Sequence, residues 1–321
     1  MDKNQPLLSI RQYNNQSKKK LTFQITNVYT SFIMFPKKQI MSFIHPIDIA
    51  RVASQSFALP DICVRIRSML DDDKSDLEDI SRFIKLDPSL SSKLLKLANS
   101  PLFRFESQID SIAKAINIIG GEALYNLVMA ETASSAFEHF SSDVIDLRRF
   151  WLQSIYAALV AKHLAKIVKI RGSERFFLLG LLHNLGELLV AVQAPDLAIK
   201  CCKYDKKTSP WKLQQQTLGF DYANCSAKLM EFWQLPSQLY IPVMDLHNEN
   251  KALESKDVSI IYIAARAGVA MAHSNLYSAS QLVTPLVLKH LNLDHEDLKD
   301  AIKFATMEAD SVLGIMNSSL R

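Results

Sequence analysis

Apolar residues recur along most of this chain at intervals of three and four, the spacing of an amphipathic α-helix. In the stretch 89–99, for example, Leu90, Leu94, Leu95 and Leu97 follow it. Patterns of this kind predict helices at 46–57, 60–70, 76–86, 89–99, 111–119, 122–140, 147–170, 174–192, 222–233 and 258–274, with two or three more in 280–318. We therefore expect an all-α fold, a multi-helix bundle with a helical N-terminal half.

Local signals mark where several of these helices begin. Asp87 followed by Pro88 is an N-cap with proline at the first helical position. Ser75 with Glu78 three residues later predicts a capping box for the helix at 76–86.

The most apolar run, 176–192, is shorter than a membrane span of about 20 residues and contains His183, Asn184 and Glu187. It predicts a central helix buried in the core. No membrane association is expected.

Composition supports a helical protein and divides the chain. Only 8 glycines and 11 prolines occur among 321 residues, so turn signals are scarce. The formal net charge of +4 arises in residues 1–45, where seven basic residues face only Asp2. The remainder is nearly balanced, which argues against general nucleic-acid binding. We expect a basic extension at 1–45, a domain at 46–250 and C-terminal helices at 251–321 that complete the bundle.

The first 45 residues differ in character from the rest. Polar stretches and a weakly alternating piece at 21–35 predict loose order, and Met41 is an alternative initiator that would make residues 1–40 a start-site artefact. No secretory signal is expected. The four cysteines have no metal-finger spacing and predict reduced thiols in a cytoplasmic protein.

Five local strings together resemble the HDOD family, the HD-related output domain of bacterial signalling proteins. The most distinctive is LDPSLSSKLLKLANS at 86–100; the others are IAKAINIIG at 112–120, FWLQS at 150–154, GLLHNLG at 180–186, and LGFDY at 218–222 with WQLP at 233–236. Their order and spacing agree with that family over about 190 residues. The resemblance implies an HD-like helical bundle.

The same resemblance indicates a degenerate metal site. HD phosphohydrolases hold divalent cations with a histidine, an adjacent His-Asp pair and a later aspartate. The resemblance places Gln153, His183-Asn184 and Ala265 at these positions. Only His183 keeps a ligand, and one imidazole cannot assemble a hard-metal site. We therefore expect no catalytic residues, no metal and no cofactor.

The surviving polar residues suggest a remnant ligand pocket formed by Gln153, His183, Asn184, Glu187 and His247. An alternative is a small metal site of His183, Glu187 and His247, because the first two are four residues apart on a helix. The simpler interpretation is that His183 is a hydrogen-bonded core histidine and that Glu187 pairs with a basic neighbour. The remaining histidines are expected mostly at the surface.

The leading hypothesis is a non-catalytic bacterial signal-transduction module that binds a partner protein or a small ligand. The resemblance implies a partner in trans, such as a kinase, a sensor or a cyclic-dinucleotide protein, and a homodimer is compatible with the apolar helix at 147–170. One alternative is a residual metal-dependent phosphohydrolase. Another is a binder of nucleic acid or anionic surfaces through the basic tail.

Overall fold

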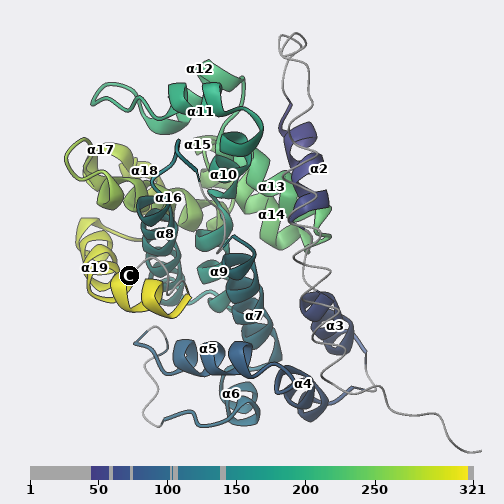
Figure 1. Ribbon diagram of the computed structural model, residues 1–321. Coiled ribbons are helices and arrows are strands. Elements are labelled where there is room, and N and C mark those ends of the chain that lie inside the picture. The colour runs from purple at the N-terminus through teal and green to yellow at the C-terminus, as the bar shows by residue number, and fades with distance from the viewer. Residues whose placement is uncertain are drawn as a thin grey trace, which may run out of the picture. The chain divides into compact units, whose positions relative to one another are not determined.

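The computed structural model describes residues 45–57, 61–72, 75–101, 103, 108–137 and 142–316. Every regular element within these ranges is a helix (Figure 1), which confirms the all-α prediction. The described residues from His45 onward belong to one compact unit. The N-terminal extension, with Met41, lies outside the described residues, and the boundary at residue 250 stays a prediction.

The N-terminal half consists of mostly short helices. They are α2 (Pro46–Ser56), α3 (Asp61–Leu70), α4 (Leu77–Ile84), α5 (Pro88–Ala98), α6 (Ile112–Ile119) and α7 (Gly121–Ala136). Of these, α4, α5 and α6 begin with a side-chain cap. Asp87 caps α5 by accepting a 3.0 Å hydrogen bond from the Leu90 amide, as predicted. The predicted capping box of α4 was wrong by one residue. Asp76 and Asp79 exchange its two bonds, at 2.7 and 3.3 Å, because a carboxylate accepts at both ends and suits a helix N-terminus.

The core is built around α8 (Leu147–Ile167), which packs against α9 (Glu174–Leu182), α16 (Lys256–Ala272) and α19 (His295–Met316). Two glycines permit the close approach of these helices. A Cβ atom on Gly180 would lie 2.4 Å from the Cα of Ala158, and one on Gly268 would lie 2.7 Å from the carbonyl oxygen of Gln153. The backbones therefore touch where α9 and α16 cross α8.

The predicted central helix is not continuous. The chain forms α9 and α10 (Leu185–Gln193), and it leaves helical geometry at Asn184, where φ is −108° and ψ is 9°. After this break α10 packs on α13 (Tyr222–Phe232). The Gly186 amide there donates a 2.8 Å hydrogen bond to the Ser226 hydroxyl. Contact with two different sets of helices requires the change of direction.

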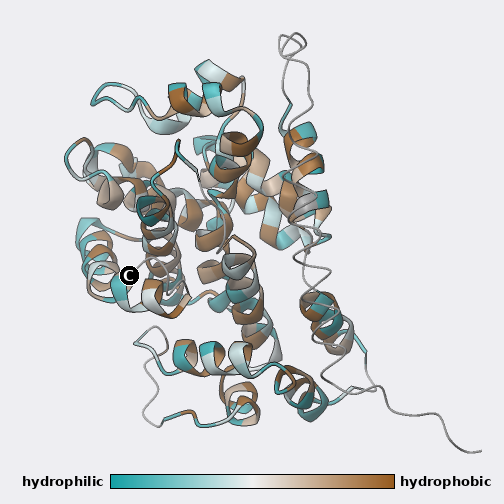
Figure 2. Ribbon diagram, viewed as in Figure 1, coloured by the Kyte–Doolittle hydropathy of each residue, from teal (hydrophilic) through white to brown (hydrophobic). Residues whose placement is uncertain are grey.

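Among the described residues, one stretch, Glu174–Gln193, has the length and hydropathy of a membrane span, and 89% of its most apolar window is buried inside the protein. Figure 2 shows hydrophobic ribbon at both α9 and α10. The expectation that this segment is buried in the core is confirmed.

The remaining helices enclose the C-terminal half. They are α11 (Pro195–Cys201), α12 (Pro210–Leu218), α14 (Ser237–Met244), α15 (Glu249–Glu254), α17 (Ala279–Leu282) and α18 (Pro285–His290). α14 packs on α13, while α15, α17 and α18 pack on α16 (Figure 1). The site is lined by residues of α8, α10, α12, α13 and α16 and of the break after α9.

Candidate functional site

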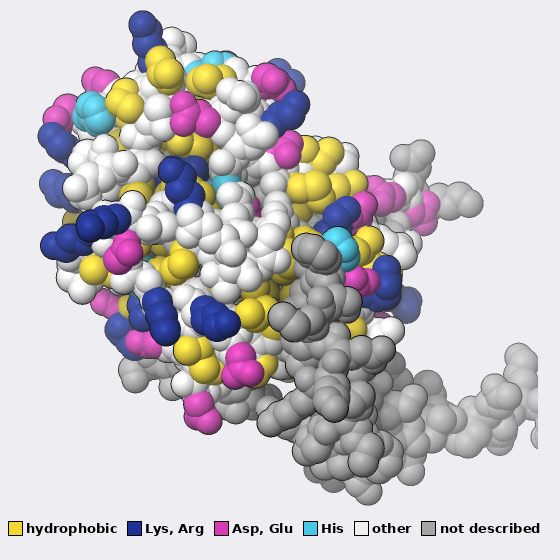
Figure 3. All heavy atoms as spheres, turned by 90° about the horizontal axis from the view of Figure 1, so that it is seen from above, with side chains coloured by type: hydrophobic (Ala, Val, Ile, Leu, Met, Phe, Trp, Pro, Cys, Tyr) yellow, Lys and Arg dark blue, Asp and Glu magenta, His cyan; other side chains and the backbone are white. Residues whose placement is uncertain are grey.

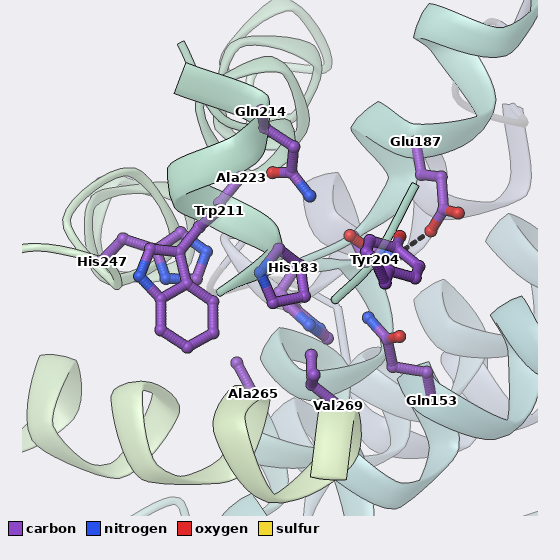
Figure 4. A pocket seen from close by; sticks show the side chains of 12 residues that line it. Gln153, His183, Glu187, Tyr204, Trp211, Gln214, Ala223, His247, Ala265 and Val269 are labelled. Atoms are coloured by element: carbon purple, nitrogen blue, oxygen red, sulfur yellow. Dashed lines mark hydrogen bonds between the residues drawn. The ribbon is translucent and has the colours of Figure 1, made fainter. Parts of the chain in front are cut away.

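The structure brings the five candidate residues together around one cavity. Gln153 comes from α8, His183 and Asn184 from the break, Glu187 from α10, and His247 from the turn after α14. The other lining residues are Tyr204, Pro210, Trp211, Gln214, Ala223, Ala265 and Val269 (Figure 4). The space open to the centre of a water-sized sphere is about 20 Å³, room for about one water molecule. Side chains largely fill the site.

His183 is a buried histidine with a fixed tautomer. It is 3% exposed, and its Nδ1 lies 2.6 Å from the carbonyl oxygen of Gly180. Because a carbonyl only accepts, Nδ1 carries the hydrogen, and in the neutral ring Nε2 is left as an acceptor. Burial lowers the pKa of His183 to about 4, against a smaller opposing effect of this hydrogen bond. The prediction of a hydrogen-bonded core histidine is confirmed.

Glu187 has an amide as its hydrogen-bonding partner. The side-chain amide of Asn184 donates to a carboxylate oxygen of Glu187 at 2.6 Å, so the expected pairing with a basic neighbour was wrong. Glu187 is 4% exposed, and burial raises the pKa of its carboxyl, while Asn184 and the more distant Arg149 lower it. The pair joins the break to the first turn of α10.

An aromatic group closes one side of the cavity. The rings of Trp211 and His247 are stacked, with centroids 4.9 Å apart and planes 13° from parallel, and Figure 4 shows them facing each other. The guanidinium carbon of Arg266 lies 4.4 Å from the centroid of Trp211 and 3.2 Å from that of Tyr262. These are cation–π distances.

Sequence reasoning missed Trp211, and also Tyr204 and Gln214 elsewhere on the cavity wall. The available signal was Pro210-Trp211 at the start of a short helix, but nothing in its spacing indicated that the indole lines the cavity and stacks on His247. His273 was also misjudged, because it is only 6% exposed, with its ring 4.7 Å from Tyr204. An isolated histidine at the end of a helix carries no burial signal of its own.

The residues at the cavity do not fit a divalent cation. Gln153 and Asn184 present neutral amides, and Ala265 presents a methyl group. Glu187 supplies one carboxyl, already bonded to Asn184. No group of three or more His, Cys, Asp or Glu residues within the described ranges is arranged to hold a metal ion. The alternative site of His183, Glu187 and His247 therefore lacks the necessary geometry, and hard cations require several oxygen ligands.

The match to a family model decides the relationship of the chain. The HDOD domain model matches residues 57–249. The chain belongs to the HDOD family. The described part of the matched segment holds the helices from α3 to α14 and contains every lining residue of the cavity except Ala265 and Val269. Those two residues come from α16, beyond the matched segment.

Among curated proteins, the HDOD chain is similar to an uncharacterised protein of Treponema pallidum (strain Nichols). The two are 26% identical over 196 residues, which is 59% of this chain and 37% of the relative. The chain thus spans well under half the length of that protein.

Solved structures share the fold of this HDOD protein. A candidate phosphohydrolase of Shewanella amazonensis SB2B is 22% identical with a TM-score of 0.63, over 85% of this chain and 98% of that one. An HDOD domain protein of unknown function from Geobacter sulfurreducens is 18% identical with a TM-score of 0.63, over 86% of this chain and 98% of that one. A candidate signal-transduction protein of Marinobacter aquaeolei VT8 is 19% identical with a TM-score of 0.61, over 92% of this chain and 66% of that one. At these identities the likeness shows the fold alone.

The buried imidazole of His183 makes the stability of the HDOD domain sensitive to acid. Its pKa is lowered from 6.5 to about 4 on folding, so the folded state resists protonation. The stabilising contribution is complete above about pH 6.5 and is lost as the pH falls toward 4. We expect His183→Asn to remove a slope of up to about 1.4 kcal/mol per pH unit in this window, measured by urea unfolding at pH 7.0, 5.5 and 4.5.

The comparison with the variant is needed because Asp221 changes the stability with pH in the opposite direction to His183. Burial raises its pKa to about 6, so its contribution is lost as the pH rises from about 4 to 6. Both proteins keep Asp221, and its effect cancels in the difference. Equal pH slopes for wild type and His183→Asn would show that His183 titrates alike in the folded and unfolded chains.

Proposed function

We propose that this HDOD protein is a non-catalytic signal-transduction module that binds a partner protein or a small ligand. The observation that carries the proposal is that Gln153, Asn184 and Ala265, which the family resemblance places at metal-ligand positions, line the cavity without a carboxylate or imidazole among them. Hydrolysis of a phosphate ester in the HD manner needs a cation that activates water. A cavity with one carboxyl group and neutral amides lacks the charge to hold that cation.

The relatives support a regulatory class in a coarse way. One structure of the same fold is named a candidate signal-transduction protein and another a candidate phosphohydrolase. The residual phosphohydrolase is therefore the second candidate function. It requires His183 and Glu187 to recruit a cation with ligands that substrate or water would supply.

The face of the protein drawn in Figure 3 offers no concentrated positive charge for nucleic acid. In the face shown in Figure 3, lysine and arginine side chains are interspersed with aspartate and glutamate rather than gathered into one patch. A nucleic-acid site requires clustered positive charge. We propose instead a signalling protein as partner in trans, in the cytoplasm, with a homodimer as the alternative assembly.

The metal content of the purified protein tests the proposal. We expect elemental analysis without added chelator to find iron, manganese, nickel and zinc far below one atom per chain, because the donor set is too weak. Turnover of bis-p-nitrophenyl phosphate with added manganese should equal that of a His183→Ala control. The full chain is used for both measurements.

Stoichiometric metal that is lost in His183→Ala, together with turnover that falls in the same variant, would contradict the proposal and establish the residual phosphohydrolase. Metal that is equally present in both proteins would point to a site elsewhere and leave the cavity non-catalytic.

A further inference from the structure

The wall of the cavity is polar but almost without charge. Side-chain amides come from Gln153, Asn184 and Gln214, and among the described residues no lysine, arginine or aspartate lines it. Its one carboxyl, that of Glu187, already accepts from Asn184. An ion of either sign would therefore lose its hydration without gaining a free opposite charge. An uncharged molecule with hydrogen-bonding edges would find both donors and acceptors.

One side of the same cavity is flat. The indole of Trp211 lies against the imidazole of His247 at 4.9 Å, within 13° of parallel, and Trp211 is only partly buried. The Nδ1 atom of His247 is buried and has no hydrogen-bonding partner within the described structure. The imidazole of His247 is thus stacked on a planar aromatic ring that the protein itself supplies, the indole of Trp211.

The helix that carries the indole is attached by replaceable contacts. α12 is nine residues long, and its main helical neighbour is α11. It is tied to the body by hydrogen bonds from the Tyr222 amide to Gln214 at 3.0 Å, and from Gln215 to Asp221 at 3.3 Å. The Tyr277 hydroxyl holds the preceding turn through the Thr208 carbonyl, at 3.0 Å. Water can substitute in such bonds at small net cost.

The small size of the cavity means that α12 controls whether a ligand can enter. With space for about one water molecule, about 20 Å³, nothing larger enters while Trp211 is in place. Removal of the indole would open the space beside His247 and next to Gln153.

We propose that the indole of Trp211 occupies the binding position of a flat, uncharged heteroaromatic ligand with amide-like edges. This ligand binds when α12 moves aside. This deepens the proposed function and rests on it. The ring of the ligand stacks on His247, and its edge exchanges hydrogen bonds with the amide of Gln153 and with Nε2 of His183. Binding competes with the internal indole, so the affinity of the wild-type protein is reduced by the fraction of closed molecules.

Adenosine and adenosine monophosphate are suitable probes, because they share one flat ring and differ in charge. Titration calorimetry on the full chain should show that Trp211→Ala binds adenosine at least about tenfold more tightly than wild type does, since the competing ring is gone. Adding His247→Ala or Gln153→Leu to this variant should weaken binding about tenfold. The monophosphate should bind no more tightly than adenosine.

A second measurement avoids the cavity variant, in case it is unstable. Adenosine added to the wild-type protein should change its tryptophan fluorescence, because the Trp211 indole is displaced from His247. The same addition to Trp211→Phe should produce no such change. Trp211→Phe is the matched control, since it keeps an aromatic ring at the same position.

Three results would overturn the inference. If Trp211→Ala binds indole as tightly as adenosine, the variant has only an apolar cavity without selectivity for hydrogen-bonding edges. Tighter binding of the monophosphate would show an anion site at Arg266, which lies behind the indole. Failure of both the titration and the fluorescence change would remove the ligand class, while the metal measurement above would still decide the proposed function independently.

Discussion

A chain that carries Gln153→His, Asn184→Asp and Ala265→Asp together is expected to bind one divalent metal ion per molecule. The three positions already line one cavity with His183, so the substitutions supply an imidazole and two carboxylates to the surviving ligand. Without metal the variant should be less stable than wild type, because two carboxylates are buried without partners. With manganese at about 100 times its Kd, it should regain about 2.7 kcal/mol.

Thermal unfolding with and without manganese, together with elemental analysis, measures this result. Wild type should show no shift, and adding His183→Ala to the triple variant should abolish the shift. If the triple variant folds but its thermal stability does not change with manganese, these positions do not correspond to the metal ligands of HD enzymes. The interpretation of the site as a degenerate metal site would then lose its basis.

Replacement of Gly180 by alanine is expected to destabilise the protein by about 3 kcal/mol or more, which is the upper range for overpacking. The new methyl group would lie 2.4 Å from the Cα and 2.5 Å from the amide nitrogen of Ala158. Both are backbone atoms of α8, so a rotamer change cannot relieve the contact. Urea unfolding gives the free energy directly.

Gly121→Ala is the matched control, another glycine-to-alanine change within a helix. Its methyl group would meet only the ends of the Leu70 and Leu77 side chains, at 2.7 and 3.2 Å, which can rotate away. Its stability should stay within about 1 kcal/mol of wild type. Equal losses in the two variants would show that α9 moves away from α8 easily.

Much of the fold could be predicted because its signals are local. Asp87-Pro88 fixes the start of α5, and the apolar spacing within 89–99 identifies the buried Leu90, Leu94 and Leu97. The break between α9 and α10 could not be seen, because the apolar run continues through it. A change of helix direction depends on which neighbours pack on either side, here α8 before the break and α13 after it.

The candidate site divides in the same way. Gln153, His183 and Asn184 were predicted from the family resemblance, Glu187 and His247 from their positions relative to His183, and the structure places all five around one cavity. Binding of a ligand there stays a prediction. Trp211 and Gln214 belong to no such motif, and α12 reaches the cavity only through tertiary packing. The partner of Glu187 was misassigned because sequence spacing gives no direction of a side chain across a helix break.

The interruption at His183 and Asn184 gives the cavity a mechanical position in the bundle. α9 before it contacts α7 and α8, whereas α10 after it contacts α2 and α13. This pair of residues therefore joins two helices that pack on different neighbours. We therefore expect a substitution at His183 to disturb the packing of both α9 and α10 rather than that of one helix.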